Sequence, residues 1–342
     1  LLVFSMVSTG ALGLWESMWP SYTMLMLIHV LWAVTTVLTF WSSSVKCINL
    51  LADSDEQGGM FGSLEALRGV SGLIVTTICV SLFNIFSDDS TLAMSSIVRV
   101  VSVIMILVGV ALALLMPQSN AQQATNATLL DSVKAMGVAF KRPITYLLSG
   151  MIFCGSMTLA SAAYYAPYLT DYCGMSKDLA ITFTNYRGIV CQLIGASLAA
   201  LLATRLKNSS KPMIGAGVVG IACFVGMFLI PASAAVLWPV MILTIVASMA
   251  VYVFRALYYA TVDESGTPKN VVGSVIGIAS LLGFLPDTFY TSLCGSWLDA
   301  DPVGGYKNIF MAACAAMVLG LVCAFFAERL IKKYRNSASA AE

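Results

Sequence analysis

The chain consists of long apolar runs separated by short polar segments. A membrane-spanning helix needs about 20 apolar residues, whereas a spanning β-strand needs only about 9–11. Inside a bilayer every backbone N–H and C=O must be bonded within the protein, and a helix achieves this within each run. The pattern predicts an all-α integral membrane protein. The ten expected spans are residues 1–19, 21–50, 59–86, 91–116, 143–172, 177–205, 211–230, 234–261, 268–297 and 305–332.

The composition excludes several other classes of protein. Only 10% of the residues are charged and 59% are apolar, whereas a soluble domain carries about 25% charged residues. The net charge of +1 does not indicate a nucleic-acid partner. The nine cysteines lie mostly within apolar runs without CxxC pairs, so packing is favoured over a metal or a disulfide framework. No P-loop, HExxH or GxSxG constellation is found, so we expect no enzyme, no cofactor and no metal.

Lysine and arginine set the expected orientation, because short cytoplasmic loops carry an excess of them. If the chain starts on the cytoplasmic side, twelve of these residues fall on that side and two fall outside. Both ends are therefore expected in the cytoplasm of a bacterial inner membrane. The two outer residues are Lys177 and Lys307, and the four within spans are Arg68, Arg99, Arg187 and Arg255.

One long polar stretch, residues 118–142, divides the chain. Its part from Leu129 to Phe140 has apolar residues at helical spacing with lysines beside them, which predicts an amphipathic helix on the membrane surface. The expected domains are an N-terminal bundle (1–117), this cytoplasmic loop (118–142), and a C-terminal bundle with a tail (143–342).

An internal repeat relates the two halves. Phe61-Gly62-Ser63 matches Val272-Gly273-Ser274 at an offset of 211 residues, and each follows an acidic loop. Small residues such as Gly62 and Gly273 let helix backbones approach closely. With this offset, two spans of the second half have no partner in the first. This is the pattern of a six-plus-six transporter that lacks its first two helices, so we expect an N-terminally truncated chain.

These features resemble the major facilitator superfamily along the whole chain. The resemblance is strongest to a bacterial group, the YihN-like transporters, and the residues that carry it are Glu56-Gln57-Gly58, Phe61-Gly62, Glu65, Arg68-Gly69, Pro167-Tyr168-Leu169, Gly273-Ser274 and Pro286-Asp287. The resemblance implies two pseudo-symmetric helix bundles, with about ten of the usual twelve helices present, that rock around a central cavity.

Arginines within spans are the first candidates for the solute site. Arg187, in Asn185-Tyr186-Arg187, lies near the middle of its span, where an isolated arginine costs about 2.5–3.5 kcal/mol. It is interpreted as binding an anion or serving in coupling, and the alternative is a structural ion pair or a bond to helix carbonyls. Arg255, beside Tyr258, serves as a gate or solute ligand, or extends its side chain to the interface.

Further candidates are polar groups on other spans. Glu65 and Arg68 share a helix face, and they pair with each other or with the facing half in gating. His29, on one face with Trp32, is a packing residue or a proton relay. Tyr164 belongs to an interfacial belt or an outer gate. Asp287 is a candidate carrier of a coupling proton.

The predicted function is a secondary transporter that moves a small polar solute, with an anion favoured, across the inner membrane by alternating access, with proton coupling or exchange. The predicted partners are the solute, the lipid bilayer and protons, with no nucleic acid, and the chain is expected to be a monomer. The alternative is a transporter-like membrane sensor or a non-functional remnant.

Overall fold

The structure of the chain is a computed structural model. It describes residues 1–51, 56–86, 89–115, 129–231 and 233–339. Within these ranges every regular element is a helix and no strand is present. The predicted all-α fold is confirmed.

The helices of the first half follow the expected spans. Their bounds are α1 (Leu2–Glu16), α2 (Tyr22–Trp32), η1 (Ala33–Trp41), α3 (Ser42–Leu51), α4 (Gln57–Ile85), α5 (Ser90–Leu115) and α7 (Leu129–Lys141). The element η1 is a π-helix, and it joins α2 to α3 without a break. A continuous helical segment therefore runs from residue 22 to residue 51.

The helices of the second half also follow the expected spans. Their bounds are α8 (Pro143–Ser161), η2 (Ala162–Tyr164), α9 (Tyr165–Cys173), α10 (Lys177–Leu206), α11 (Ser210–Leu229), η3 (Ala234–Val236), α12 (Leu237–Leu257), α13 (Ala260–Glu264), α14 (Lys269–Gly283), α15 (Pro286–Ala300) and α16 (Pro302–Ser339).

Length and composition support eight of the ten expected spans. Among the described residues, eight helical stretches are long and apolar enough to cross a membrane, and two shorter apolar helices, Leu2–Glu16 and Tyr22–Thr36, accompany them. Each of the ten corresponds to one expected span. The expected loop is described only from Leu129 onward, where α7 confirms a helix; residues 118–128 lie outside the described residues. Met136 and Phe140 of α7 are exposed, and its place on a membrane surface stays a prediction.

The chain forms two compact units. Unit 1 comprises residues 1–47 and 71–134, and unit 2 comprises residues 48–70 and 135–342. The beginning of α4 thus belongs to unit 2 and the rest of α4 to unit 1. The division of the chain at residues 118–142 stays a prediction.

In unit 1, α1 packs against α5 and η1. Small residues allow this contact, because a Cβ atom added to Gly10 would lie 2.7 Å from the carbonyl oxygen of Ser102. Hydroxyl groups connect α1 to the π-helix: Thr9 Oγ1 donates to Thr35 Oγ1 at 2.9 Å. The indole of Trp32 donates to the carbonyl oxygen of Thr9 at 3.1 Å.

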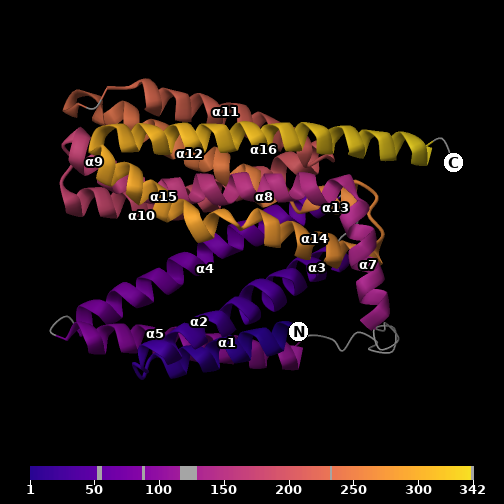
Figure 1. The fold of residues 1–342 in the computed structure, drawn as a ribbon, viewed down its shortest axis with the longest axis horizontal. Helices are drawn as coiled ribbons and strands as arrows, with labels where there is room; N and C mark the ends of the chain where they lie inside the picture. Colours follow the sequence, from indigo (N-terminus) through magenta and orange to yellow (C-terminus); the bar gives the residue numbers. More distant parts are fainter. Residues whose placement is uncertain (52–55, 87–88, 116–128, 232, 340–342) are drawn as a thin grey trace. The chain divides into compact units, whose positions relative to one another are not determined.

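In unit 2, α8 lies against α16 and α14, while α11 packs on both α12 and α16, and α10 packs on α12 (Figure 1). The side chains of Leu148, Met151 and Ile152 on α8 are completely buried in this bundle. Phe254 on α12 and Phe310 on α16 are also completely buried. The unit therefore has an apolar core, and the buried polar groups described below are exceptions within it.

Two spans of unit 2 are interrupted. The span that begins at α8 passes through the short 3₁₀ element η2 into α9. The span of α14 and α15 breaks before Pro286, which occupies the first turn of α15 and cannot donate a backbone hydrogen bond there. In transporters, broken helices expose backbone polar groups near solute sites. The polar groups around these two interruptions are therefore candidates for a solute site.

Candidate functional site

A cavity of about 190 Å³ lies inside unit 2, between the α8–η2–α9 segment, α10 and α12. Its lining is largely apolar, with a few hydroxyl groups and one cation. The lining residues are Thr158, Leu159, Ala162, Ala163, Tyr165, Arg187, Gly188, Ser248, Val251 and Tyr252. We call it the Arg187 cavity.

Arg187 of α10 provides the charge of this cavity. Only 7% of the residue is exposed, so the guanidinium is removed from water as the sequence predicts. One terminal nitrogen, Nη1, donates to the hydroxyl of Ser248. The guanidinium carbon lies 4.7 Å from the ring centre of Tyr165, which is a cation–π contact. The Nε atom is buried and has no hydrogen-bond partner in the described part of the chain.

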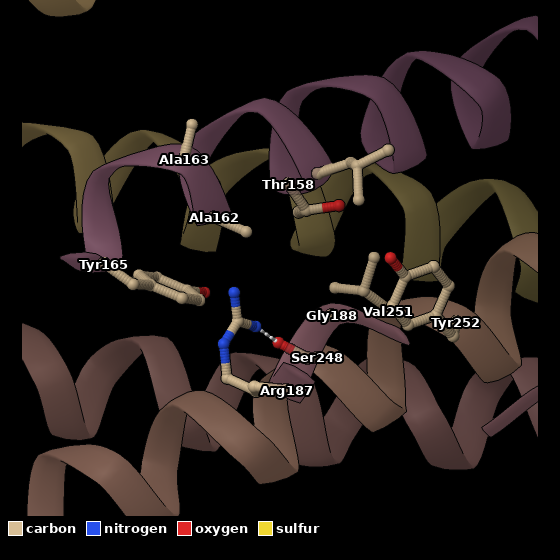
Figure 2. A pocket seen from close by; sticks show the side chains of 10 residues that line it. Thr158, Ala162, Ala163, Tyr165, Arg187, Gly188, Ser248, Val251 and Tyr252 are labelled. Atoms are coloured by element: carbon tan, nitrogen blue, oxygen red, sulfur yellow. Dashed lines mark hydrogen bonds between the residues drawn. The ribbon is translucent and has the colours of Figure 1, made fainter. Parts of the chain in front are cut away.

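Ser248 is held in place by its own helix. Its hydroxyl donates to the carbonyl oxygen of Thr244 at 2.7 Å, which leaves its lone pairs to accept from Arg187. Figure 2 shows the guanidinium reaching from α10 toward Ala162 and Thr158, beside the ring of Tyr165. Two neighbouring helices therefore fix the position of the arginine.

The other residues predicted around Arg187 lie elsewhere. Asn185 and Tyr186 are exposed and do not line the cavity, with 61% of Tyr186 accessible. Tyr258 is buried against Tyr259, with ring centres 4.6 Å apart. Arg255 is half-buried and interacts electrostatically with Glu65, but it does not line the cavity.

Sequence reasoning assigned four of the polar lining residues no place in the solute site: Thr158, Tyr165, Ser248 and Tyr252. Ser248 and Tyr252 are four residues apart, so they share one face of α12, and both are polar in an apolar span. That spacing is a signal that could have identified them. Tyr165 follows the 3₁₀ element η2, which no sequence pattern predicts. The direction of the Tyr165 side chain could therefore be learned only from the structure.

Glu65 forms the second polar centre of unit 2. Its carboxylate is buried and accepts from Arg68 Nη1 at 2.7 Å and from Gln192 Nε2 at 2.9 Å. The predicted pairing of Glu65 with Arg68 is therefore present, and a partner from α10 joins it. Their role in gating stays a prediction.

The start of α4 lies very close to α10. A Cβ atom added to Gly62 would lie 2.6 Å from the Cβ atom of Ala200, and one added to Gly58 would lie 2.5 Å from that of Ala203. These distances are too short for any side chain, so the two glycines are required for this approach. Gly273, its counterpart in the repeat, is half-buried in α14.

A row of polar contacts joins α8 and η2 to α15 on the far side of the break. Ser156 donates to the carboxylate of Asp287. The hydroxyls of Ser161 and Tyr290 lie 2.8 Å apart, and the Tyr164 hydroxyl donates to a backbone carbonyl of α15 at 3.2 Å. Asp287 itself is exposed. Tyr164 and Asp287 thus belong to one contact surface, and neither lines the Arg187 cavity.

His29 and Trp32 lie in unit 1. They line a separate cavity of about 490 Å³ between α1, α2, η1 and α5. The histidine ring meets the Trp32 ring edge-on with centres 5.4 Å apart, and its Nε2 lies 4.0 Å from the carboxylate of Glu16. About half of the His29 side chain is exposed.

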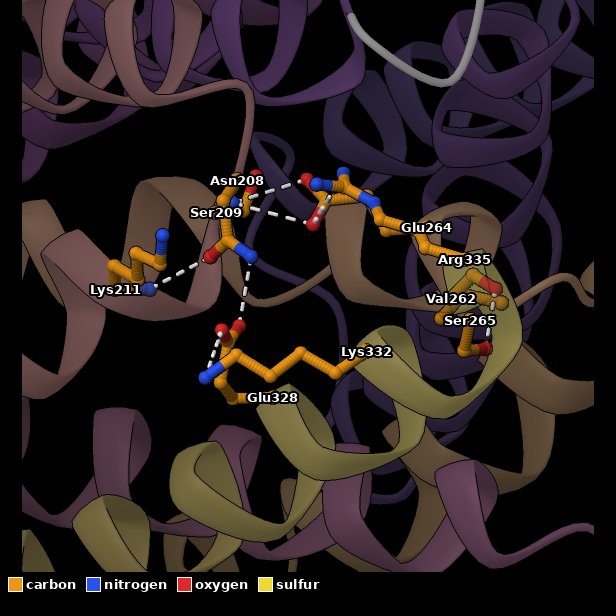
Figure 3. A network of polar contacts seen from close by, with 9 residues as sticks. All are labelled: Asn208, Ser209, Lys211, Val262, Glu264, Ser265, Glu328, Lys332 and Arg335. Atoms are coloured by element: carbon orange, nitrogen blue, oxygen red, sulfur yellow. Dashed lines mark hydrogen bonds and ion pairs between the residues drawn. The ribbon is translucent and has the colours of Figure 1, made fainter. Parts of the chain in front are cut away.

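A charged cluster surrounds the beginning of α11. The carboxylate of Glu264 accepts from the backbone N–H of Ser209 at 3.0 Å, so a side chain from α13 caps this helix. Asn208 donates to Glu328 at 2.7 Å, and Arg335 lies 3.9 Å from Glu264 (Figure 3). Burial raises the pKa of Glu264 from 4.5 to about 7, against the opposing effect of its Ser209 and Arg335 contacts.

No group of three or more potential metal ligands was found among the described residues. The side chains of the Arg187 cavity offer one cation, several hydroxyls and apolar walls. This combination can bind a small polar molecule that carries a negative charge.

Comparison with known proteins gives consistent matches. A profile of the Major Facilitator Superfamily matches residues 1–291. The inner membrane protein YqcE of Escherichia coli (strain K12) is 29% identical, covering 99% of this chain and 80% of YqcE. The inner membrane protein YihN of the same strain is 22% identical, covering 98% and 81%. The crystal structure of FucP, a transporter of the same superfamily in the outward conformation, aligns with a TM-score of 0.71 and 13% identity over 95% of this chain and 81% of FucP.

Proposed function

This chain belongs to the major facilitator superfamily, and from that membership we propose that it is a secondary active transporter that moves a small polar, anionic solute by alternating access. It is a multi-pass inner-membrane protein of the transporter fold. The family and its neighbours favour a transporter over an enzyme. The proposed partners are one solute, the bilayer and protons, with the chain acting as a monomer.

The observation that carries the proposal is the buried cation of the Arg187 cavity. In the described part of the chain no carboxylate forms an ion pair with Arg187. A guanidinium inside an apolar span without a counter-charge is unfavourable, and such residues mark solute and ion pathways. An anionic solute supplies the missing charge. The Arg187 cavity is therefore the proposed solute site.

Gating is assigned to the contact between α4 and α10. Glu65, Arg68 and Gln192 form a polar connection beside the Gly62–Ala200 contact, so the helices are held by both packing and hydrogen bonds. In this proposal the connection opens and closes as the carrier reorients. Arg255 and Tyr258, which interact electrostatically with Glu65, complete the gate.

Two coupling modes follow from different groups. Asp287, which accepts from Ser156, and His29 can carry a proton in symport. Exchange is the second mode, because an empty carrier would have to reorient with Arg187 unpaired, whereas a carrier loaded with an anion would not.

Uptake into proteoliposomes tests the function. Purified protein is reconstituted, and accumulation of radiolabelled small organic acids, sugar acids and neutral sugars is measured against protein-free vesicles. We expect time-dependent uptake of at least one acid, driven by an imposed pH gradient or by unlabelled solute inside. Binding without any uptake would refute transport and favour a membrane sensor.

A further inference from the structure

The charge balance of the Arg187 cavity limits the valence of its ligand. Arg187 is the only ionisable cation in the lining, and the lining contains no carboxylate. A ligand with one negative charge neutralises it. A dianion would leave one buried charge without compensation, and a neutral ligand would leave the arginine unpaired; both are costly in a medium of low polarity.

The hydrogen bonds of the guanidinium limit the shape of the charged group. Ser248 occupies Nη1, and the ring of Tyr165 covers one face of the guanidinium. The buried Nε atom has no partner among the described residues. The edge formed by Nε and Nη2 therefore contains a buried donor that lacks a partner, and a guanidinium edge of this kind can give two parallel hydrogen bonds to a planar carboxylate.

The remaining lining residues limit the rest of the ligand. A volume of about 190 Å³ is smaller than the roughly 300–1,000 Å³ of drug-sized pockets, so the ligand must be compact. The Thr158 hydroxyl donates to the carbonyl oxygen of Cys154 at 2.8 Å, so it can only accept from a ligand. The Tyr252 hydroxyl makes no hydrogen bond with the described residues, so it can donate or accept.

We infer that the Arg187 cavity selects a compact hydroxylated monocarboxylate, with the carboxylate on the Nε–Nη2 edge of Arg187 and a hydroxyl beside Tyr252 and Thr158. This inference rests on the proposed function, since it names the class of solute for the same site. It makes Arg187 the residue that selects for charge and Tyr252 the residue that selects for the hydroxyl.

Three matched pairs of probes separate these requirements. Glyceramide replaces the carboxylate of glycerate with a neutral amide, glycolate and tartronate differ by one added carboxylate, and lactate and propionate differ by one hydroxyl. Threonate and gluconate extend the series in length. Binding to the detergent-purified full chain is measured by calorimetric titration and by the shift in thermal unfolding temperature, so that no transport step is needed.

We expect at least one hydroxylated monocarboxylate to bind at least about tenfold more tightly than its amide and its dicarboxylate counterpart. Arg187→Gln should weaken that binding about 100-fold or more. Tyr252→Phe should remove most of the preference of lactate over propionate while propionate affinity stays the same. Arg99→Gln is the matched control, because Arg99 lies in another membrane span, is exposed and contacts Ser17.

The inference is overturned if no monocarboxylate of the panel binds, if the amide or the dicarboxylate binds equally well, or if Arg187→Gln retains affinity while it unfolds at the temperature of the parent chain. Should Arg187→Gln be unfolded, Arg187→Lys replaces it, with loss of affinity expected because a lysine cannot offer two parallel donors. Binding of glycerate without uptake would contradict the proposed transport but not the ligand class. Uptake of a neutral sugar at the same rate in the parent chain and in Arg187→Gln would contradict the ligand class but not the proposed transport.

Discussion

Arg187 and Glu65 are both buried within apolar helices, but their surroundings differ. Glu65 has a cationic partner in Arg68 and an amide partner in Gln192, so its charge is compensated within the protein. Arg187 has a hydroxyl and an aromatic ring, which are weaker partners for a full charge. At the scale of single residues, the first arrangement is compensated within the protein, and the second supports the proposal that Arg187 binds a ligand.

Replacement of Glu65 tests the structural connection. Glu65→Ala leaves Arg68 and Gln192 without their common acceptor, and we expect the free energy of unfolding to fall by about 1–3 kcal/mol. Glu65→Gln should lose less, because its amide oxygen still accepts one of these bonds. Thermal unfolding of the purified protein measures both variants. Glu56→Ala, at an exposed position, is the control, and an unfolding temperature of Glu65→Ala equal to that of the control would refute the connection.

At the scale of elements, the molecule uses small residues where two helices meet. The start of α4 contacts α10 through Gly58 and Gly62, and α1 contacts α5 through Gly10. Such contacts place backbones close together, so they are sensitive to one added methyl group. A hydrogen bond between elements also stabilises the beginning of α11, since Glu264 of α13 accepts from the backbone N–H of Ser209.

Two glycines of α4 provide a matched test of the close contact. A Cβ atom at Gly62 would lie 2.6 Å from Ala200, whereas one at Gly72 meets nothing within 4 Å. Gly62→Ala should therefore lower the free energy of unfolding by about 1–3 kcal/mol. Gly72→Ala should raise it by about 0.5–1 kcal/mol, because alanine favours a helix. Equal unfolding temperatures for the two variants would argue against the contact.

The Glu264 cluster predicts a pH dependence. The pKa of Glu264 is about 7 in the folded chain and 4.5 as its ordinary value, so the folded state binds more protons between these limits. Its contribution to the free energy of unfolding is complete below pH 4.5 and is lost as the pH rises toward 7, by roughly 3 kcal/mol in total.

Melting curves at several pH values check this prediction. The unfolding temperature of the parent chain should fall between pH 5 and pH 8 more than that of Glu264→Gln, whose amide oxygen still accepts from Ser209 but does not titrate. Parallel curves for the two proteins would show that Glu264 does not cause the dependence. Glu16→Gln, on a half-buried side chain of unit 1, controls for the loss of a carboxylate.

At the scale of the whole molecule, the apolar helices define a membrane protein and the distribution of basic residues predicts how it is inserted. Positive charges on one side of the spans oppose translocation, so both chain ends are expected in the cytoplasm. This orientation places the Glu264 cluster at the cytoplasmic ends of its helices. It also places the loop between α15 and α16 outside.

Reporter fusions test the orientation. Alkaline phosphatase, which is active only outside the cytoplasm, should be inactive when fused after Glu342 and active when fused after Asp301. A fluorescent protein that matures only in the cytoplasm should give the opposite result at the same two positions. Activity of phosphatase at Glu342 would reverse the predicted orientation.

The sequence by itself determined the class of fold and where the apolar helices lie, because each span must satisfy its own backbone hydrogen bonds and this depends only on local composition. The end of the last helix differs from the expectation, since α16 continues to Ser339 instead of ending at residue 332. It also identified Arg187 and the Glu65–Arg68 pair, since a charged residue within an apolar run can be recognised from the sequence alone. Tertiary structure alone decided what surrounds them. Tyr165, Gln192 and Ser248 are distant in sequence from the charges they contact, and a helix break sets the direction of Tyr165. Contacts between different helices depend on how the helices pack in three dimensions. The hydrophobic periodicity of one helix does not show which other helix packs against it.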